Sequence, residues 1–179
     1  TNAGCLQSCI FKIYSWNSGS LSVILASILN RTLTLGTSMD ISVVIPVYNE
    51  EANIDLLYQR LSGILKDLTS QYELLFVNDG SSDRSIQLIK ALSQKDPAVK
   101  FLDFSRNFGH QIAVTAGLDY TSGQAVVIID ADLQDPPELI ADMYHKMKEG
   151  FEVVYAQRKT RKGESWLKLW TARTCYRIL

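Results

Sequence analysis

Cysteine is scarce in this chain of 179 residues, which contains only three. The count is odd, and the positions Cys5, Cys9 and Cys175 do not have the spacing of a zinc site. We therefore predict reduced thiols without a structural role. Long apolar runs are also missing, because the best candidate, near residues 21–35, is interrupted by serine, asparagine and arginine. It falls short of the roughly 20 apolar residues that a membrane-spanning helix needs.

Two glycine-rich signatures are absent as well. The first predicted strand is followed by Tyr48-Asn49-Glu50, where a dinucleotide-binding protein would carry G-x-G-x-x-G. No G-K-[ST] motif of the P-loop type occurs either. These absences exclude the common dinucleotide and P-loop sites, and the net charge of −1 argues against a dedicated nucleic-acid binder.

Acidic residues are lacking from residues 1–38, whose only formal charges are Lys12 and Arg31. This segment is rich in serine, threonine and asparagine and has no clear hydrophobic period. A poor signal or transit sequence is one interpretation, and upstream sequence translated in frame is the other. We favour the second because Met39 directly precedes the first strong strand pattern. We expect residues 1–38 to be an N-terminal extension of non-domain or non-native sequence, outside a domain formed by residues 39–179.

What is present, from residue 41 onward, is an alternation of strand and helix patterns. Strands are predicted by β-branched and aromatic runs, and helices by apolar residues at three- and four-residue spacing. The expected strands are Ile41–Val47, Tyr72–Val77, Val99–Phe104, Val126–Ile129 and Phe151–Ala156. The expected helices carry Ile54 to Leu68, Ile86 to Leu92, Gln111 to Tyr120 and Leu139 to Lys148. Such alternation predicts an α/β domain, with a mostly parallel sheet and helices on both faces.

The most informative stretch is VVIIDADLQDPPE, residues 126–138. Residues two apart on an extended chain project to the same side, so Asp130 and Asp132 should face one point. Converging carboxylates would repel each other unless a cation lay between them, and Mg²⁺ or Mn²⁺ prefers such oxygen ligands. Gln134 offers a further neutral oxygen. Pro136-Pro137-Glu138 is predicted to open the next helix.

Other polar motifs follow the other predicted strands. Ligands of parallel sheets gather at the carboxyl ends of the strands, which is where Asn49, Asp79 and Arg106 fall. Asn49 could serve as a helix cap. Asp79 could belong to a simple turn or could accept hydrogen bonds from a nucleobase or ribose. The loop from Arg106 to His110 suits a phosphate or sugar, and His110 is either a general base or, more commonly, a solvated or capping histidine.

The C-terminal stretch is locally basic. Residues 158–177 contain seven Lys or Arg residues against Glu164 alone, interleaved with Trp166, Trp170 and Tyr176. This mixture suits the headgroup zone of a bilayer. A solvated basic helix is the alternative.

Together, SVVIPVYNEE, LLFVNDGSSD, SRNFGH and DADLQDPPE resemble the family 2 glycosyltransferases of the GT-A fold. More narrowly, residues 39–179 resemble the polyprenyl-phosphate glycosyltransferases, that is, dolichol-phosphate mannosyltransferases and bactoprenol glucosyltransferases. The resemblance implies that Pro46, Tyr48, Glu50, Asp79 and Asp130 bind the nucleotide sugar. It implies that Asp130, Asp132 and Gln134 bind the metal and diphosphate. It further implies that Asp132 and Arg158 are catalytic, and that Arg158, with Lys168 or Arg173, contacts the acceptor phosphate.

The resemblance also implies an activity. The expected reaction is a metal-dependent, inverting transfer of a hexose from a UDP- or GDP-sugar to undecaprenyl or dolichyl phosphate. It would take place at the cytoplasmic face of a membrane during cell-wall or lipopolysaccharide biogenesis, in a protein that can be a homo-oligomer. We expect this chain to be a fragment that ends before C-terminal membrane helices. The alternatives are a soluble family member acting on a saccharide acceptor and an inactive fragment that still binds a nucleotide sugar.

Overall fold

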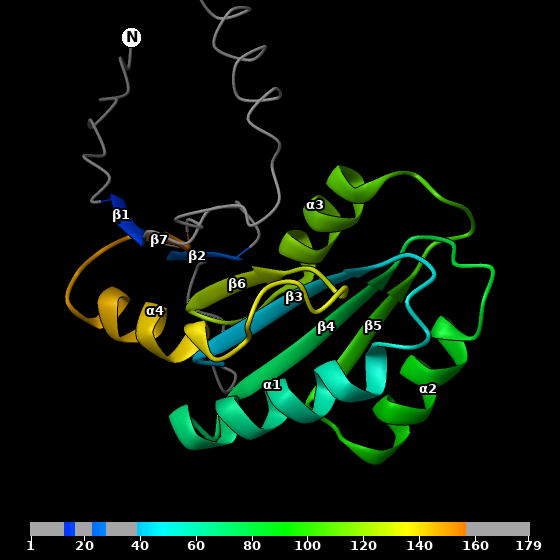
Figure 1. Ribbon diagram of the computed structural model, residues 1–179, viewed down its shortest axis with the longest axis horizontal. Coiled ribbons are helices and arrows are strands. Elements are labelled where there is room, and N and C mark those ends of the chain that lie inside the picture. Colours follow the sequence, from blue (N-terminus) through cyan, green and yellow to red (C-terminus); the bar gives the residue numbers. More distant parts are fainter. Residues whose placement is uncertain (1–12, 17–22, 28–38, 157–179) are drawn as a thin grey trace, which may run out of the picture.

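The computed structural model describes residues 13–16, 23–27 and 39–156, and side chains only within residues 39–156. Its elements follow one another as strands and helices along the chain (Figure 1). The strands are β1 (Ile13–Trp16), β2 (Val23–Ser27), β3 (Ile41–Val47), β4 (Tyr72–Asn78), β5 (Val99–Asp103), β6 (Ala125–Ile129) and β7 (Val153–Ala156). The helices are α1 (Ile54–Leu68), α2 (Ser85–Lys95), α3 (His110–Tyr120) and α4 (Leu139–Lys148). The predicted strands and helices after residue 40 are therefore confirmed within a few residues.

The strands form one sheet in the order β1-β7-β2-β6-β3-β4-β5. From β6 to the edge strand β5, the strands β6, β3, β4 and β5 pair in parallel, with Ile41 opposite Tyr72 and Ala125. Each parallel connection needs a helical crossover, which the predicted alternation supplies. The carboxyl ends of these four strands consequently lie along one edge of the sheet.

The sequence predicted no strand before Ile41, and here the structure differs. β2 pairs antiparallel with both β6 and β7, and β1 pairs in parallel with β7. The β-branched run Val23-Ile24 has strand propensity, but its pairing depends on β6 and β7, which lie 100 or more residues further along the chain. The boundary between the extension and the domain stays a prediction.

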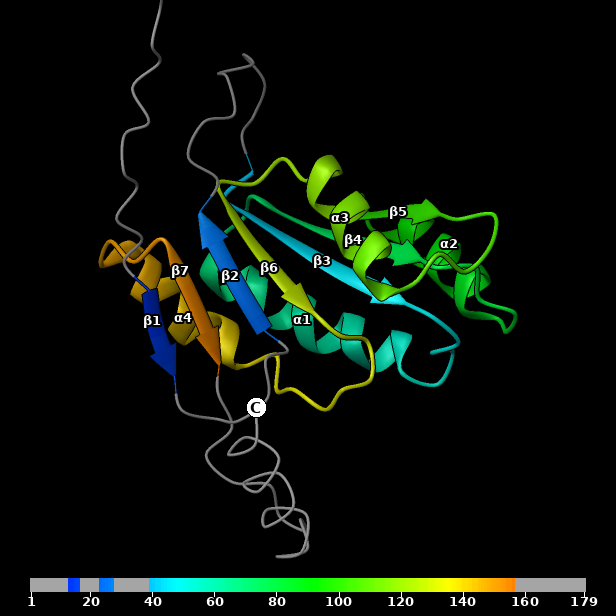
Figure 2. The ribbon, with the colours of Figure 1, turned by 90° about the horizontal axis from the view of Figure 1, so that it is seen from above.

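The two faces of the sheet are covered unequally. Of the helices in the described residues, Figure 1 shows α3 on one side of the sheet and α1, α2 and α4 on the other. Successive residues of β3 point to opposite faces, so Val43 and Ile45 join the core beneath α1 while Val44 packs with Ala113 of α3. Gly117 allows α3 to approach very closely, because a Cβ atom there would lie 2.3 Å from Val44 Cγ1. Figure 2 shows the same arrangement from above.

Helix α4 begins at Leu139, the first residue of its predicted range, but Pro136 and Pro137 lie just before it and do not form its first turn. They form the preceding turn, in which the N–H of Leu139 donates to the Pro136 carbonyl at 3.2 Å. Proline fits both the first turn of a helix and the turn before it, because neither place requires an N–H donor. Only the tertiary contacts decide between the two.

Within the described residues, no helix combines the length and the apolar character needed to cross a membrane.

Candidate active site

A cavity of about 240 Å³ opens at the carboxyl ends of the parallel strands. Its wall comes from four chain segments that are far apart in the sequence. The lining residues are Pro46, Val47, Tyr48, Glu50, Asp79, Asn107, Gly109, His110, Ala113, Asp130, Ala131 and Asp132. This is the edge at which the sequence placed its polar motifs.

Most of the residues predicted from the family resemblance lie together in this cavity. They are Pro46, Tyr48, Glu50, Asp79, Asp130 and Asp132. Gln134 does not line it: its side chain is exposed, and its backbone N–H donates to Asp132 Oδ1 at 3.0 Å. Arg158, Lys168 and Arg173 lie outside the described residues. The roles assigned to all of these residues remain predictions.

Asp130 and Asp132 occupy the end of β6 as the strand pattern required. The strand buries Val127 and Ile129, and Asp130 follows immediately in a half-buried position. Just after Asp132, the chain turns sharply through Leu133, whose φ is +59°. A non-glycine residue in this left-handed conformation is uncommon, so the turn is held by its surroundings.

The electrostatic environment of Asp130 favours a cation. Burial raises the pKa of this carboxyl, the nearby carboxylates of Asp132, Asp135 and Glu50 raise it further, and His110 alone lowers it. His110 Nε2 lies 3.8 Å from Asp130 Oδ1. No lysine or arginine is among the described residues that line the cavity.

These residues fit a divalent metal ion of the Mg²⁺ type. No group of three or more His, Cys, Asp or Glu residues with metal-binding geometry occurs in the described part of the chain. Magnesium, however, often takes only one or two protein carboxylates and completes its shell with water and substrate phosphates. Asp130 and Asp132 satisfy that requirement.

Asp79 is buried and fixes a neighbouring loop. Its Oδ1 accepts the N–H of Phe108 at 2.7 Å, and its Oδ2 accepts the N–H of Gly109 at 2.9 Å. The sequence left a turn and a nucleotide contact open for Asp79, and neither predicted this bond to a loop 30 residues away. Each carboxylate oxygen keeps a further lone pair, so a ligand contact remains chemically available.

The loop after β3 is tied to the loop after β4. The N–H of Asn49 donates to Ser81 Oγ at 3.0 Å, and Asn49 Oδ1 accepts the N–H of Ser82 at 2.8 Å. The N–H of Glu50 donates to Ser85 Oγ at 3.0 Å. Asn49 adopts a φ of +57° and does not cap α1, which begins only at Ile54 after Asn53. The helix-cap interpretation of Asn49 is therefore wrong, and its side chain instead positions Tyr48 and Glu50.

Three further cavity residues come from the loop before α3 and the start of α3: Asn107 and Gly109, to which the sequence analysis gave no individual role, and His110, for which it left a general base and a solvated or capping histidine open. The signal was available, since the loop from Arg106 to His110 was judged suitable for a phosphate or sugar. What the sequence could not supply was the fold of the loop. Asp79 and the close approach of Gly80 bring it over the cavity, and a Cβ atom on Gly80 would lie 2.3 Å from the Arg106 carbonyl carbon.

Comparison with known proteins adds the family. The model of the family described as "Glycosyl transferase family 2" matches residues 42–178. The chain is 61% identical over 138 residues to the uncharacterized glycosyltransferase YkcC of Bacillus subtilis (strain 168), covering 77% of this chain and 43% of that protein. It is 42% identical over 140 residues to the bactoprenol glucosyl transferase of Shigella phage SfX, covering 78% of this chain and 46% of that protein. The chain thus spans less than half the length of these relatives.

Solved structures share the fold. TarS 1–349 of S. aureus matches with a TM-score of 0.51 at 24% identity, over 62% of this chain and 33% of that chain. The same protein in complex with UDP matches with a TM-score of 0.50 at 25% identity, over 62% and 32%. The glucosyl-3-phosphoglycerate synthase of M. tuberculosis matches with a TM-score of 0.50 at 24% identity, over 75% and 48%. The predicted α/β fold of the GT-A type is confirmed.

Proposed function

Because the chain belongs to glycosyl transferase family 2 and is thus a glycosyltransferase, we propose that it transfers a hexose from a nucleotide diphosphate sugar to a polyprenyl phosphate. The observation that carries the proposal is the meeting of Asp130 and Asp132 with Tyr48, Glu50 and Asp79 in one cavity. Carboxylates that can hold a metal ion thereby lie beside groups that can hold a nucleotide. The complex of S. aureus TarS with UDP supports a uridine nucleotide as one candidate donor.

The acceptor is proposed from the relatives. The bactoprenol glucosyl transferase of phage SfX is 42% identical to this chain over 140 residues, and bactoprenol is a polyprenyl lipid. We extend that acceptor class to the present chain and place the reaction at the cytoplasmic face of a membrane. Arg158, Lys168 and Arg173 are the candidate contacts for the acceptor phosphate, because guanidinium and ammonium groups bind phosphate oxygens strongly.

In the proposed reaction, the acceptor phosphate is the nucleophile and the donor nucleoside diphosphate is the leaving group. A phosphate oxygen of the acceptor attacks the anomeric carbon as the bond from that carbon to the donor diphosphate breaks, which inverts the anomeric centre. The acceptor oxygen is already anionic, so no strong general base is needed. When bound by Asp130 and Asp132, a divalent cation would neutralise the charge that develops on the leaving diphosphate.

The residues of the chain itself orient the donor. Tyr48 is half exposed at the cavity wall and offers a ring surface for the nucleobase. Glu50 and Asp79 can accept hydrogen bonds from ribose hydroxyls or base N–H groups. The bonds from Asn49 and Asp79 to neighbouring loops hold these groups in place before the donor arrives, which lowers the cost of binding.

The direct test is calorimetry of donor binding by the full chain. UDP-glucose and GDP-mannose are titrated side by side, each with Mn²⁺ and again with EDTA. We expect metal-dependent binding of one of them, which would also distinguish a glucosyl from a mannosyl donor. Equal binding with and without metal would contradict the metal role. The acceptor is tested separately by a transfer assay, in which transfer to a sugar but not to undecaprenyl phosphate would contradict the proposed acceptor.

A further inference from the structure

Among the four helices of the described part of the chain, α3 has an unusual surface. It contains no lysine, arginine or glutamate and a single acidic residue, Asp119, whereas α1, α2 and α4 each carry at least one lysine. Apolar residues with side chains accessible to solvent recur every fourth position along it and in the loop before it. We call this set the apolar strip: Phe108, Ile112, Ala116 and Tyr120. Three of them are large and well exposed, at 41% for Phe108, 51% for Ile112 and 67% for Tyr120.

A different side of α3 packs against the sheet, so the residues of the apolar strip do not belong to the hydrophobic core. Ala113 is fully buried against the sheet, and Gly117 lies against Val44 and Val77. Among the described helices, α3 is the only one on its side of the sheet (Figure 2). The apolar strip is thus a second face of α3, with no described element packed upon it.

The charged side chains near the strip lie at its two ends. Arg106 and His110 are at the end beside the cavity, and the exposed Asp119, next to Tyr120, is at the other end. The Arg106 guanidinium lies 4.7 Å from the centre of the Phe108 ring, and Phe104 meets the same ring edge to face at 5.6 Å. A cation held over exposed aromatic and aliphatic groups suits the headgroup zone of an anionic bilayer.

The strip begins at the mouth of the cavity. Asn107, Gly109 and Ala113 line the cavity. Phe108 lies between the first two in the sequence, and Ile112 directly precedes the third. A polyprenyl phosphate must place its phosphate in the cavity while its isoprenoid chain stays in the bilayer. A surface that rests on the membrane would therefore have to adjoin this mouth.

We propose that the apolar strip, with Arg106, is a membrane-contact surface that seats the catalytic domain on an anionic bilayer and brings the cavity to its lipid acceptor. The proposal rests on the proposed function, because the acceptor class supplies the reason for membrane contact. α3 would lie along the interface with its apolar side toward the acyl chains. The basic stretch of residues 158–177 would be a separate contact.

The test reads membrane contact at a single position. In a background with Cys5→Ser, Cys9→Ser and Cys175→Ser, Ile112→Cys is labelled with the environment-sensitive dye nitrobenzoxadiazole. Leu56→Cys, on α1 and 49% exposed, is the matched control. On addition of vesicles of phosphatidylethanolamine and phosphatidylglycerol, we expect the emission at position 112 to rise and shift to the blue, and that at position 56 to stay unchanged. No change at position 112, or an equal change at both, would overturn the proposal.

A second measurement uses the unlabelled chain. Ile112→Ser combined with Tyr120→Ser should lower partition onto the same vesicles about tenfold, while Leu56→Ser should leave it unchanged. Neither Ile112 nor Tyr120 lines the cavity, so calorimetric donor binding should be retained. Unchanged partition with normal donor binding would overturn the membrane surface alone. Absent donor binding with intact partition would overturn the proposed function alone. A dye response that grows with protein concentration before vesicles are added would indicate a protein partner and overturn the bilayer assignment.

Discussion

At the scale of single residues, Asp132 is the candidate metal ligand whose role a single substitution tests most directly. It shares the cavity with Asp130, and its Oδ1 accepts the N–H of Gln134, so one oxygen orients the turn while the other can face a metal ion. Replacing it by asparagine keeps the shape and removes the charge that a cation needs.

We expect Asp132→Asn to lower the transfer rate at least about 100-fold, because the charge on the leaving diphosphate would lose its counter-charge. Metal-dependent donor binding should fall with it, while the melting temperature should change little. Asp142→Asn, at an exposed position on α4, is the matched control and should behave as wild type. Wild-type turnover by Asp132→Asn would remove the metal role.

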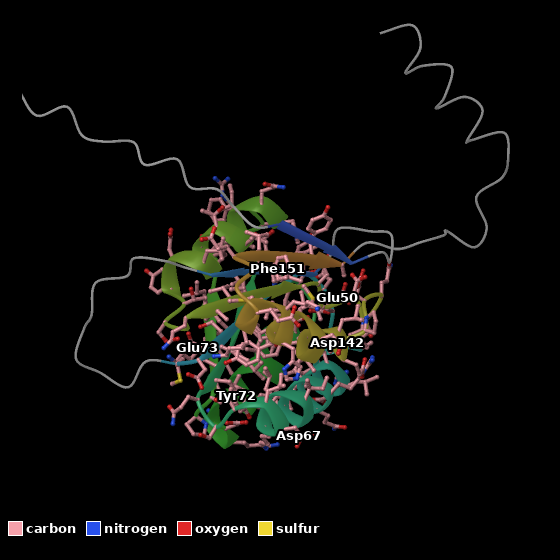
Figure 3. The ribbon with its side chains drawn as sticks, turned by 90° about the vertical axis from the view of Figure 1, so that its left-hand side faces the viewer. Glu50, Asp67, Tyr72, Glu73, Asp142 and Phe151 are labelled. Atoms are coloured by element: carbon pink, nitrogen blue, oxygen red, sulfur yellow. The ribbon has the colours of Figure 1, made fainter. Side chains whose placement is uncertain are left out.

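Glu73 is a residue that the sequence analysis did not single out. It lies in β4 toward the end of the sheet opposite Glu50 (Figure 3), and its side chain is completely buried. Oε1 accepts hydrogen bonds from Ser42 Oγ at 2.5 Å and from the N–H of Ser122 at 2.7 Å, and Oε2 pairs with Lys100 Nζ at 2.6 Å. The network ties β3, β4 and β5 to the connection between α3 and β6. Burial alone would raise the pKa of Glu73, but the hydrogen bonds from Lys100, Ser42 and Ser122 outweigh burial and lower it.

This lowered pKa predicts an acid-sensitive fold. A carboxyl whose pKa is lower in the folded than in the unfolded state stabilises the fold above its unfolded pKa, and that stability is lost as the pH falls through the folded value. We expect the free energy of unfolding to drop as the pH falls below the ordinary pKa of glutamate. Glu73→Gln should cost about 2–4 kcal/mol at neutral pH and flatten this drop, as measured by urea unfolding. Glu149→Gln, at an exposed position, is the control; an equal pH slope in Glu73→Gln and wild type would contradict the assignment.

At the scale of elements, the site is a set of loops held against one another. Asn49 joins the loop after β3 to the loop after β4, and Asp79 joins the latter to the loop before α3. Gly80 lets the loop after β4 approach the loop before α3 very closely. A Cβ atom there would meet backbone atoms of Arg106 and Asn107 at 2.3–2.7 Å, and backbone cannot swing away as a side chain can.

Gly80→Ala should therefore displace the loop that carries Asn107 and His110, and we expect donor affinity to fall about tenfold or more. Gly150→Ala is the matched control, because Gly150 also has a positive φ, +98°, but has open space around its Cβ position. It should cost only about 1 kcal/mol of backbone strain and leave donor affinity intact. Calorimetry and thermal melting of both variants separate the two effects. Equal affinity losses in both would show that strain, and not the loop contact, is responsible.

At the scale of the whole molecule, one cavity collects residues from positions 46 to 132. Its wall comes from the ends of β3, β4 and β6 together with the start of α3. A ligand that contacts all of these segments binds the folded chain and not the unfolded chain, so its binding energy adds to the stability of the whole domain.

We expect Mn²⁺ with UDP or GDP, at about 100 times the dissociation constant, to stabilise the fold by about 2.7 kcal/mol. For a chain of this size that corresponds to a rise in melting temperature of roughly 5–10 °C. EDTA should abolish the rise, and the nucleotide that gives it should match the donor found by calorimetry. A melting temperature that neither nucleotide moves would contradict the donor site.

The sequence by itself determined the elements after residue 40 and the edge at which the site forms. Strand and helix patterns such as Ile41–Val47 and Ile54–Leu68 are set by residues that are neighbours in the chain, so their periodicity can be read without the fold. The alternation of these patterns required a parallel sheet, and a parallel sheet gathers its strand ends at one edge. Asp79, Asp130 and Asp132 could therefore be placed together from the sequence.

The tertiary structure alone decided how the parts meet. It placed β2 between β6 and β7, gave Asn49 a partner at Ser82, turned Asp79 toward Phe108 and Gly109, and buried Glu73 against Ser42 and Ser122. Each of these contacts joins residues about 30 or more positions apart. Their formation depends on strand register, loop path and packing distance, which no local sequence pattern encodes.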